Sequence, residues 1–365
     1  MGVVFDRKGR FLAVGLFDPD SPIRLRILNQ GTPVPVGPAF FRERVQAALD
    51  GRRTLLDDPQ TTGFRLLNGE GDRLPGLVVD RYGPTLVMKL YSPVWLPRLR
   101  EVVPPLVELL EPDAIIGLSS RKLANHPMCP PVLRGGALLH GSDPGAALPF
   151  LESGLHFQAH PVEGHKTGFY LDQRANRRQV EDDVRSLAQA HRSVRVLNVF
   201  SYSGGFSLYA ARGGAAQVTS VDRSEPALEQ ARRHFELNAQ VAQATTHETL
   251  AGDAFQVMEE LGRQGERFHL VVVDPPSFAK EASQVPGALA AYGKLTRLAL
   301  PLIQSGGILV QASCSSRVEA APFFDAIHQV AGPRIREIRR TGQPLDHPAG
   351  FPEGHYLKCL FARVD

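Results

Sequence analysis

Two residues, Asp274 and Cys314, have side chains capable of catalysis and stand at or just beyond the ends of apolar runs. Asp274 follows Leu270-Val271-Val272-Val273 and opens the motif Asp-Pro-Pro-Ser-Phe. Prolines fix φ and remove backbone donors, so the carboxylate and the neighbouring carbonyls are held in a set direction. That arrangement suits an enzyme that handles a nitrogenous base. The plainer alternative is a loop acid followed by incidental prolines.

Cys314 follows the next apolar run along the chain and lies between Ser313 and Ser315. A lone cysteine is usually a small buried hydrophobic residue. Its place at the carboxyl end of the strand after that of Asp274 favours a nucleophile instead. C5 of a pyrimidine is too electron-poor to take a methyl group until a thiolate has added to C6. We therefore predict Cys314 and Asp274 as the catalytic residues.

Three earlier motifs are typical of a nucleoside cofactor site. The turn from Asn198 to Gly204 lets backbone amides approach a ligand, although an ordinary strand-to-helix turn has the same composition. Asp222 ends the next apolar run and can accept hydrogen bonds from ribose hydroxyls. Asp253 can meet an adenine amine or can simply cap the following helix. The absence of Gly-x-Gly-x-x-Gly disfavours a nicotinamide dehydrogenase.

A polar segment, 164–174, precedes the first of these runs and is too rich in polar groups to be core. A solvated helix start capped by Asp172 is the simpler interpretation of it. We predict that cations in and after this segment hold phosphates of a nucleic acid and that Phe278 stacks on a base. The predicted substrate contacts are Lys166, Arg177, Arg178, Pro276 and Phe278, with Arg174 also near a phosphate.

The elements that must position these residues alternate in type from about residue 146 onward. This spacing predicts a parallel sheet covered by helices on both faces, with a last strand, 356–361, at its edge. The expected strands are Val194–Val199, Gln217–Val221, Thr246–Ala251, Phe268–Val273 and Gly307–Ala312, and the expected helices are Glu225–Ala239, Ala254–Leu261 and Ala288–Ile303.

Two regions of different character precede this alternation. Residues 1–33 have short β-like runs separated by turn residues, and residues 34–145 mix helical and strand-like patterns. The Pro- and Gly-rich stretch 129–145 is the best linker candidate. We therefore expect three domains, 1–33, 34–145 and 146–365.

The composition is that of a globular protein. Of the 365 residues 43% are hydrophobic and 22% charged, and the net charge of +3 permits a nucleic-acid partner without requiring one. No apolar run is long enough to cross a membrane, and the first ten residues lack the apolar core of a secretory signal. Cys129, Cys314 and Cys359 are too dispersed for a zinc site or a disulfide framework, which favours a reducing, cytoplasmic location without a metal.

Several long motifs together resemble the RlmI-type 23S rRNA cytosine-C5 methyltransferases. The resemblance extends in order over nearly the whole chain. The motifs are residues 71–83 (GDRLPGLVVDRYG), 165–174 (HKTGFYLDQR), 196–206 (VLNVFSYSGGF), 274–278 (DPPSF), 313–315 (SCS), 346–348 (DHP) and 351–358 (FPEGHYLK).

This resemblance implies a class I methyltransferase domain of Rossmann-like α/β fold with seven strands, a central α/β domain and a PUA-like RNA-binding segment. It implies S-adenosylmethionine (SAM) as cofactor, large-subunit ribosomal RNA as partner, and a homodimer as a candidate assembly. The implied cofactor-binding residues are Tyr170, Asp172, Gln173, Arg174, Asn198, Phe200, Ser201, Tyr202, Ser203, Gly204, Asp222, Arg223, Ser224, Asp253, Ala254, Asp274 and Pro275.

The chain departs from the family pattern at its beginning and beside Asp274. Only the later strands of a PUA-like domain, from about Val3 to Leu28, are present. Pro276-Ser277 stands where the better-known RNA cytosine-C5 enzymes carry a second cysteine, so the group that assists product release is not identified. Two other functions remain open: methylation of a guanine or adenine nitrogen, and an RNA-binding factor that binds SAM without catalysis.

Overall fold

The chain forms two compact units rather than the three domains expected. The computed structural model describes residues 1–164 and 166–365. The first unit comprises Met1–Leu171 and Leu345–Gly354, and the second comprises Asp172–Pro344 and His355–Asp365. The main chain therefore passes between the units three times.

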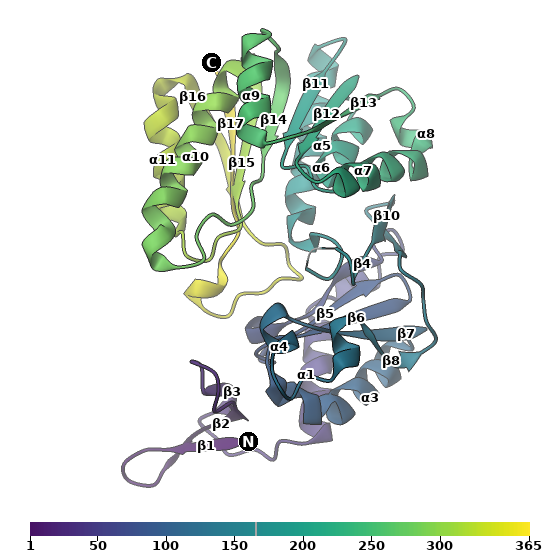
Figure 1. Ribbon diagram of the computed structural model, residues 1–365, viewed down its shortest axis with the longest axis vertical. Coiled ribbons are helices and arrows are strands. Elements are labelled where there is room, and N and C mark those ends of the chain that lie inside the picture. Colours follow the sequence, from purple (N-terminus) through teal and green to yellow (C-terminus); the bar gives the residue numbers. More distant parts are fainter. Residues whose placement is uncertain (165) are drawn as a thin grey trace. The chain divides into compact units, whose positions relative to one another are not determined.

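A seven-stranded sheet forms the centre of the second unit, in the order β13-β12-β11-β14-β15-β17-β16 (Figure 1). The strands from β13 to β15 pair in parallel, whereas β17 is antiparallel to β15 and β16. The strand order reverses between β11 and β14, and ligands of open α/β sheets bind at the carboxyl ends of strands at such a point. The strands are β11 (Arg195–Val199), β12 (Gln217–Asp222), β13 (Thr246–Ala251), β14 (Phe268–Val273), β15 (Ile303–Ser313), β16 (Ile335–Thr341) and β17 (Lys358–Val364).

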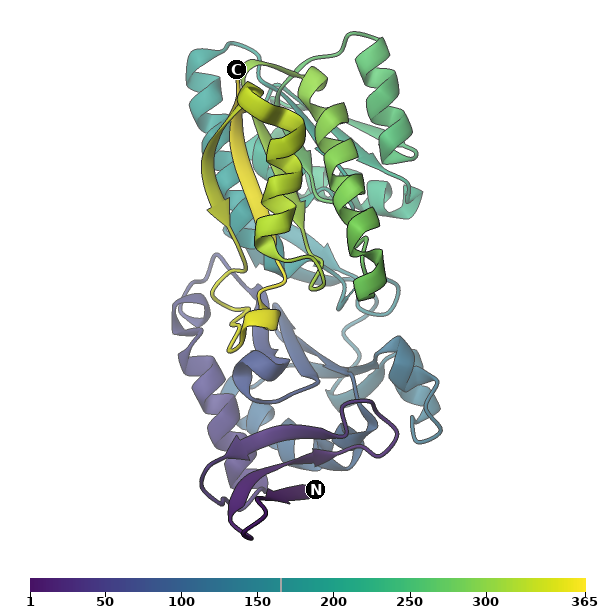
Figure 2. The ribbon, with the colours of Figure 1, turned by 90° about the vertical axis from the view of Figure 1, so that its left-hand side faces the viewer.

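Helices cover both faces of this sheet (Figure 2). Successive residues of β14 point to opposite faces, so Val271 and Val273 join one core with α9, α10 and α11, while Leu270 and Val272 join another with α5 and α6. An apolar strand of this kind is buried on both sides. The helices are α5 (Arg174–Ala190), α6 (Gly205–Arg212), α7 (Glu225–Leu237), α8 (Ala239–Ala242), α9 (Ala254–Arg263), α10 (Val285–Ala299) and α11 (Ala320–Ala331).

The predicted α/β fold is confirmed, with one correction at the end of the chain. The last strand, β17, is not at the sheet edge, because it lies between β15 and β16. Six of its seven residues are buried, as expected of an internal strand. The edge strand is β16, whose sequence Ile-Arg-Glu-Ile-Arg-Arg-Thr is mostly charged and was not predicted as a strand. Charged residues are common on edge strands because they oppose pairing with other chains.

The first unit contains a five-stranded mixed sheet in the order β4-β5-β6-β7-β8. Helices α1 and α3 pack on it around a core that includes Phe41 and Trp95. No helix of the described residues, in either unit, is both long and apolar enough to span a bilayer. The strands are β4 (Gly63–Asn68), β5 (Leu77–Tyr82), β6 (Thr85–Leu90), β7 (Ala114–Ser119) and β8 (Ala137–Gly141), and the helices are α1 (Pro38–Asp50), α2 (Arg53–Leu56), α3 (Leu99–Leu110) and α4 (Arg121–Ala124).

The stretch predicted as a linker, 129–145, is instead part of the first unit. Its middle forms β8, which pairs antiparallel with β7. A hairpin of β9 (Leu148–Glu152) and β10 (Leu155–Ala159) follows and also belongs to this unit. The Phe150 ring packs against Tyr82 at 5.1 Å between centroids, and this apolar contact keeps the hairpin on β5. The boundary therefore lies at 171/172 and not near 145.

The segment Leu345–Gly354 belongs to the first unit because buried polar groups bind it there. The Asp346 carboxylate accepts a hydrogen bond from the Arg65 amide at 2.9 Å, and the Asp346 carbonyl accepts one from Arg52, also at 2.9 Å. Arg52 is 2% exposed and also forms an ion pair of 2.7 Å with Asp72. Buried charges are mostly found paired in this way, because the pairing offsets the cost of removing them from water.

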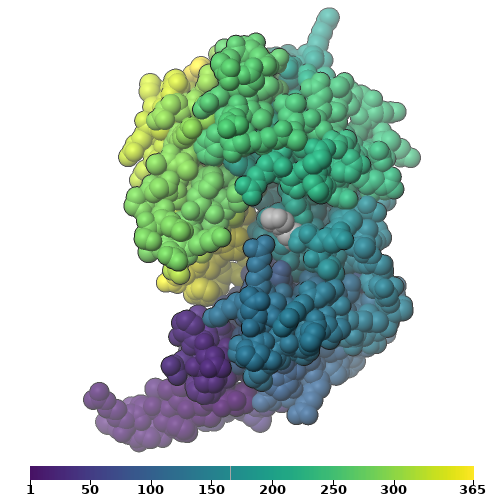
Figure 3. Space-filling view, in the orientation of Figure 1, coloured from purple at the N-terminus to yellow at the C-terminus, as the bar shows by residue number. Residues whose placement is uncertain are grey.

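The first thirty residues form a three-stranded antiparallel sheet of β1 (Gly2–Phe5), β2 (Phe11–Phe17) and β3 (Leu25–Gln30). Figure 3 shows this part, in purple, extending from the rest of the first unit. Val3, Phe5 and Leu12 are each about half exposed. The sheet is too small to enclose a core of its own, as its length suggested.

His247, at the sheet edge of the second unit, predicts an acid-sensitive stability. Its ring stacks on Phe235 at 3.7 Å, and burial, with the nearby charge of Arg232, lowers the pKa of His247 to about 4. The unfolded chain therefore binds more protons between pH 4 and 6.5, and the free energy of unfolding should fall as the pH is lowered through this range. In His247→Gln we expect a smaller loss, measured by urea unfolding at pH 7 and pH 4.5.

The matched control is His140→Gln, in the first unit, which should keep the wild-type acid sensitivity. Equal losses in wild type and His247→Gln would show that His247 does not titrate as its burial requires.

Candidate active site

The turn after β11 is held in a backbone conformation that side chains rarely adopt. Phe200, Tyr202 and Gly204 all have positive φ, at 62°, 47° and 74°. The two non-glycine residues cost on the order of 1–3 kcal/mol each, and such strain occurs mostly where a ligand is bound. Beside the turn, Asn198 is buried and donates a hydrogen bond to Ser207 Oγ at 2.9 Å.

This turn presents buried oxygen atoms that suit a polar ligand. Asn198 Oδ1 and Ser201 Oγ are buried and have no hydrogen-bond partner among the described residues. Buried oxygens normally accept hydrogen bonds, so a ligand with donors fits here. The ammonium group of SAM is such a donor. The residues present therefore fit the implied cofactor at this strand end.

Asp222, at the end of β12, ties the turn to the next strand. One carboxylate oxygen accepts the Tyr202 amide at 2.8 Å, and the other accepts the Ser224 amide at 2.9 Å. Each oxygen keeps a second lone pair, so the carboxylate can still accept ribose hydroxyls. Ser224 Oγ caps α7 by accepting the Ala227 amide, and Arg223 is exposed.

Asp253 is the N-cap of α9. Its Oδ1 accepts the amides of Phe255 and Gln256 at 3.0 and 3.3 Å. Ala254, the next residue, is buried in the core beneath the sheet. The capping interpretation of Asp253 is thus confirmed, while a second contact of its exposed carboxylate with adenine stays a prediction.

Asp253→Ser separates these two roles because serine caps a helix as well as aspartate does. We expect Asp253→Ser to melt within about 1–2 °C of wild type and to bind SAM several-fold more weakly, since one polar contact contributes about 1 kcal/mol. The measurement is isothermal titration calorimetry with SAM. Asp253→Ala serves as the control that loses the cap as well, and unchanged affinity in both variants would leave capping as the sole role of Asp253.

Asp274, after β14, is oriented by the start of the second unit. Gln173 Nε2 donates to Asp274 Oδ2 at 2.9 Å, and Gln173 Oε1 accepts from Asn176 at 2.6 Å. Asn176 in turn accepts a hydrogen bond from Thr341 Oγ1 at 2.5 Å. A carboxylate held by such a chain keeps one orientation, which is what a base-recognising acid needs.

Cys314 lies beside the turn that carries Asp274. Its thiol contacts the Pro275 carbonyl, with 3.9 Å between Sγ and O. Ser315 Oγ donates to the Ala279 carbonyl at 3.1 Å, which joins the two loops a second time. Cys314 is partly exposed, whereas Cys129 and Cys359 are buried. The structure therefore brings the two predicted catalytic residues together at the carboxyl ends of β14 and β15.

Tyr292, on α10, forms the wall behind these two loops. Its hydroxyl is 2.8 Å from Ser313 Oγ, and its ring packs on Phe278 at 5.2 Å between centroids. Burial raises the pKa of Tyr292 to about 12, so the phenol stays protonated. Phe278 is half-buried and Pro276 is exposed, which leaves both near the surface as a base platform requires.

The predicted cations divide into buried and exposed groups. Arg174 is 8% exposed and Arg177 is 2% exposed, so Arg177 offers little surface to a phosphate, contrary to expectation. Arg178 is half-exposed and lies 3.7 Å from Glu181. The reason is that α5 turns its 174 and 177 positions toward the interior, which residue type alone did not indicate.

The remaining predicted residues of the 165–174 motif lie on either side of the unit boundary. Lys166 and Tyr170 belong to the first unit, where the Lys166 ammonium lies 4.4 Å from the Tyr170 ring centroid. Asp172 begins the second unit and accepts a hydrogen bond from the Tyr356 hydroxyl at 2.8 Å. His165 lies outside the described residues.

The sequence prediction missed Tyr292, Tyr356 and Lys358 as parts of this site. The signal for Lys358 was its place directly before the apolar run Cys359-Leu360-Phe361. No spacing pattern pointed to Tyr292. The described residues contain no cluster of histidine, cysteine and acidic side chains suited to a metal ion.

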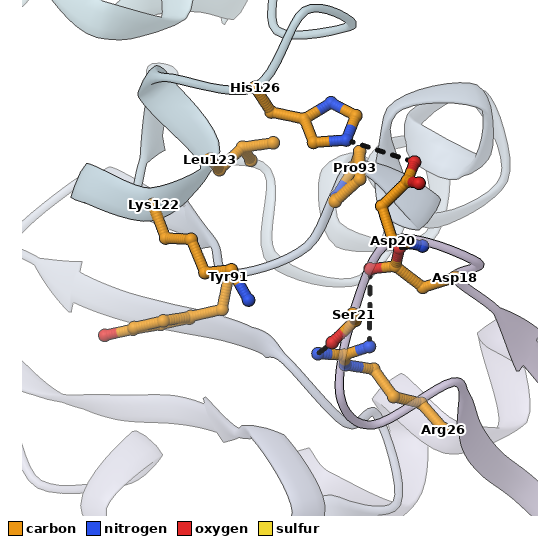
Figure 4. Close-up of a pocket in the computed structure, with 9 residues that line it drawn as sticks. All are labelled: Asp18, Asp20, Ser21, Arg26, Tyr91, Pro93, Lys122, Leu123 and His126. Atoms are coloured by element: carbon orange, nitrogen blue, oxygen red, sulfur yellow. Dashed lines mark hydrogen bonds and ion pairs between the residues drawn. The ribbon is translucent and has the colours of Figure 1, made fainter.

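The cavity drawn in Figure 4 is lined by none of the predicted site residues. It lies in the first unit between the loop after β2 and α4, and its volume of about 60 Å³ holds no more than a few water molecules. Inside it Arg26 approaches Asp18 at 3.6 Å, and His126 approaches Asp20 at 3.7 Å (Figure 4). These contacts fasten the N-terminal sheet, and the cavity is too small for a nucleoside.

Comparison with known proteins agrees with this geometry. Residues 136–362 match the family model described as S-adenosylmethionine-dependent methyltransferase. The chain is 44% identical to a ribosomal RNA large subunit methyltransferase of Deinococcus radiodurans, over 100% of this chain and 89% of that protein. It is 36% identical to ribosomal RNA large subunit methyltransferase I of Photobacterium profundum, over 97% of this chain and 88% of that protein.

A solved structure shares the fold. The crystal structure of SMU.776, described as a methyltransferase complexed with SAH, superposes with a TM-score of 0.84 at 22% identity, covering 99% of this chain and 90% of that one. The relatives and the family model identify the same family of methyltransferases, and the seven-stranded sheet has the fold shared with that solved structure. The chain belongs to the S-adenosylmethionine-dependent methyltransferase family that includes ribosomal RNA large subunit methyltransferase I.

Proposed function

We propose that this protein methylates C5 of a cytosine in large-subunit ribosomal RNA, with Cys314 as the covalent nucleophile. The substrate class follows from the relatives' names, and the carbon target follows from the site. The observation that carries the choice of C5 is the partly exposed Cys314 thiol at 3.9 Å from the Pro275 carbonyl, next to Asp274. A nitrogen atom of a base attacks a methyl donor directly and has no use for a thiol.

Recognition of the base depends on Asp274 and Phe278. The base must leave its stack to reach the strand ends, and an aromatic face such as that of Phe278 can replace the lost stacking. The Asp274 carboxylate, oriented by Gln173, accepts a hydrogen bond from the exocyclic amine of cytosine. Uracil has a carbonyl at that position, so the same carboxylate would reject it.

In the reaction the Cys314 thiolate forms a bond to C6, and the C5=C6 electron pair moves toward C5. Bound SAM would supply an electrophilic methyl group on its sulfonium and would leave as S-adenosylhomocysteine when its S–CH3 bond breaks. After C5 has taken that methyl group, loss of the C5 proton to solvent or to a base restores the double bond and expels the thiolate. Cytosine thereby gains one methyl group and loses one proton, and Cys314 is regenerated.

Residues at the carboxyl ends of β11, β12 and β13 would hold SAM beside the loops that carry Asp274 and Cys314. The 200–204 turn and Asp222 would bind its amino-acid and ribose parts, and Asp253 would contact its adenine. Holding methyl donor and carbon acceptor at contact distance supplies much of the acceleration. Arg178 and Lys166 remain the proposed phosphate contacts.

The test is incubation of the purified protein with unmethylated large-subunit rRNA and isotopically labelled SAM, followed by nuclease digestion and mass spectrometry of the nucleosides. We expect one labelled 5-methylcytidine per rRNA molecule. Label in a methylated guanosine or adenosine would refute the proposed target atom. SAM binding without any labelled nucleoside, on both free rRNA and subunit precursors, would refute the enzymatic function.

A further inference from the structure

Lys358, the first residue of β17, places a positive charge inside the second unit. The residue is 4% exposed. Its ammonium group donates to the carbonyls of Ser315 and Val318, both at 2.6 Å. None of the described carboxylates is within ion-pair distance of it, so its direct hydrogen-bond partners are these two carbonyl groups.

Burial of this charge lowers the stability of the fold, so its presence calls for an explanation. Transfer of an ammonium group from water into the interior costs several kcal/mol, and an apolar residue at the same place would avoid that cost. Burial lowers the pKa of Lys358 to about 8, and the negative charge of Cys314 acts in the opposite direction. At neutral pH the lysine is thus still charged, and a thiolate at Cys314 would favour that charge.

The two carbonyls that Lys358 binds belong to the turn that carries Cys314. In the antiparallel pairing of β15 with β17, Lys358 lies opposite Ser313, the residue before Cys314. The Ser315 hydroxyl fastens the same turn to Ala279 at 3.1 Å. The lysine therefore holds the turn from the β17 side, and the serine holds it from the side of the Asp274 loop.

We propose that Lys358 is a positioning residue for Cys314, which fixes the 314–318 turn through its two carbonyls and supplies the positive charge that favours the thiolate. This role rests on the proposed function of Cys314 as nucleophile. Thiolates of reactive cysteines are commonly stabilised by a neighbouring cation. Lys358 acts through Cys314 and need not touch the substrate.

Three other ionisable groups described near Cys314, those of Asp274, Tyr292 and Cys359, do not provide that charge. The Asp274 carboxylate, on the β14 side, carries a charge of the same sign as the thiolate and opposes it. Tyr292, on α10, is a neutral phenol with a pKa of about 12. Cys359 follows Lys358 but faces the core on the other side of the sheet, where burial raises the pKa of its thiol.

The test measures the alkylation of Cys314 by iodoacetamide between pH 5.5 and 10 in the full-length protein without RNA or SAM, read by peptide mass spectrometry. The wild-type midpoint should lie below about 8.5, the ordinary value of a free thiol. In Lys358→Met and Lys358→Gln we expect the midpoint to rise by about one pH unit or more, which lowers the thiolate fraction at pH 7 about tenfold. Lys358→Arg, which keeps the charge, should stay closer to wild type.

Single-turnover methylation separates charge from structure. In Lys358→Gln the rate should fall at pH 7 and recover as the pH rises, because the thiolate then forms without help. A lysine that only braced the turn would lower the rate equally at every pH. The matched control is Lys294→Met, a half-exposed lysine on α10, which should leave both measurements unchanged.

Two results would overturn the proposal. One is a wild-type alkylation midpoint at or above 8.5, a measurement that needs no variant to fold. The other is an unchanged midpoint in a folded Lys358→Gln or Lys358→Met protein. The midpoint could shift in these variants while the rRNA product is not 5-methylcytidine. In that case the effect of Lys358 on the thiol stands, and the function of Cys314 as nucleophile is refuted.

Discussion

Cys314→Ala is expected to abolish rRNA methylation while leaving SAM binding intact. Without the thiolate no adduct forms at C6, and C5 is not nucleophilic enough to accept the methyl group. The loss should be on the order of 10³-fold or more in the single-turnover rate, as for other enzymes that lose their nucleophile. SAM affinity should change less than about twofold, because Cys314 lies on the Asp274 side of the site and not on the 200–204 turn.

Cys129→Ala is the matched control, since Cys129 is a buried cysteine of the first unit. It should lose stability but no activity. A second readout is RNA that contains 5-fluorocytosine, which should form a stable covalent complex with the wild type because the fluorine cannot leave C5 as a cation. Normal methylation by Cys314→Ala would exclude the covalent mechanism altogether.

Asp274→Asn should have the second-largest effect, a loss of about 10²–10³-fold in kcat/KM for the RNA. Asparagine has the same shape and can still accept the hydrogen bond from Gln173, so the loop should keep its conformation. It has one acceptor oxygen fewer and no charge, and it therefore binds the cytosine amine poorly. The loss should be larger for the RNA reaction than for SAM affinity, measured by calorimetry.

Asp325→Asn, an exposed acid on α11, is the comparison for the removal of one negative charge. It should leave the kinetics unchanged. Equal weakening of SAM binding and of kcat/KM in Asp274→Asn would instead assign Asp274 to the cofactor alone.

The fold of the second unit could be predicted closely because its strands are long apolar runs. Thr246–Ala251 and Phe268–Val273 have in the structure the bounds expected for them. β16 was missed because an edge strand needs few apolar residues, and its seven residues are mostly charged. The position of β17 could not be predicted either, since the order of strands in a sheet depends on pairing between residues far apart in sequence.

The catalytic residues could be predicted because reactive side chains follow the ends of apolar strands. Asp274 directly follows one apolar run and Cys314 lies two residues after the next, and parallel strands bring such ends together at one end of the sheet. Arg177 shows the limit of this reasoning, because a guanidinium predicted to bind phosphate is buried. Lys358 shows the converse, since its role depends on pairing with Ser313, forty-five residues earlier.

The triple passage of the main chain between the units constrains when the protein can fold during synthesis. Arg52 and Arg65 are translated 294 and 281 residues before Asp346, which accepts hydrogen bonds from both. Until the ribosome has released that segment, the N-terminal half must leave these donors to water. Maturation of the first unit is therefore delayed until residues 345–354 have been translated, and a nascent chain stopped before residue 345 would present it to proteases in an unfinished form.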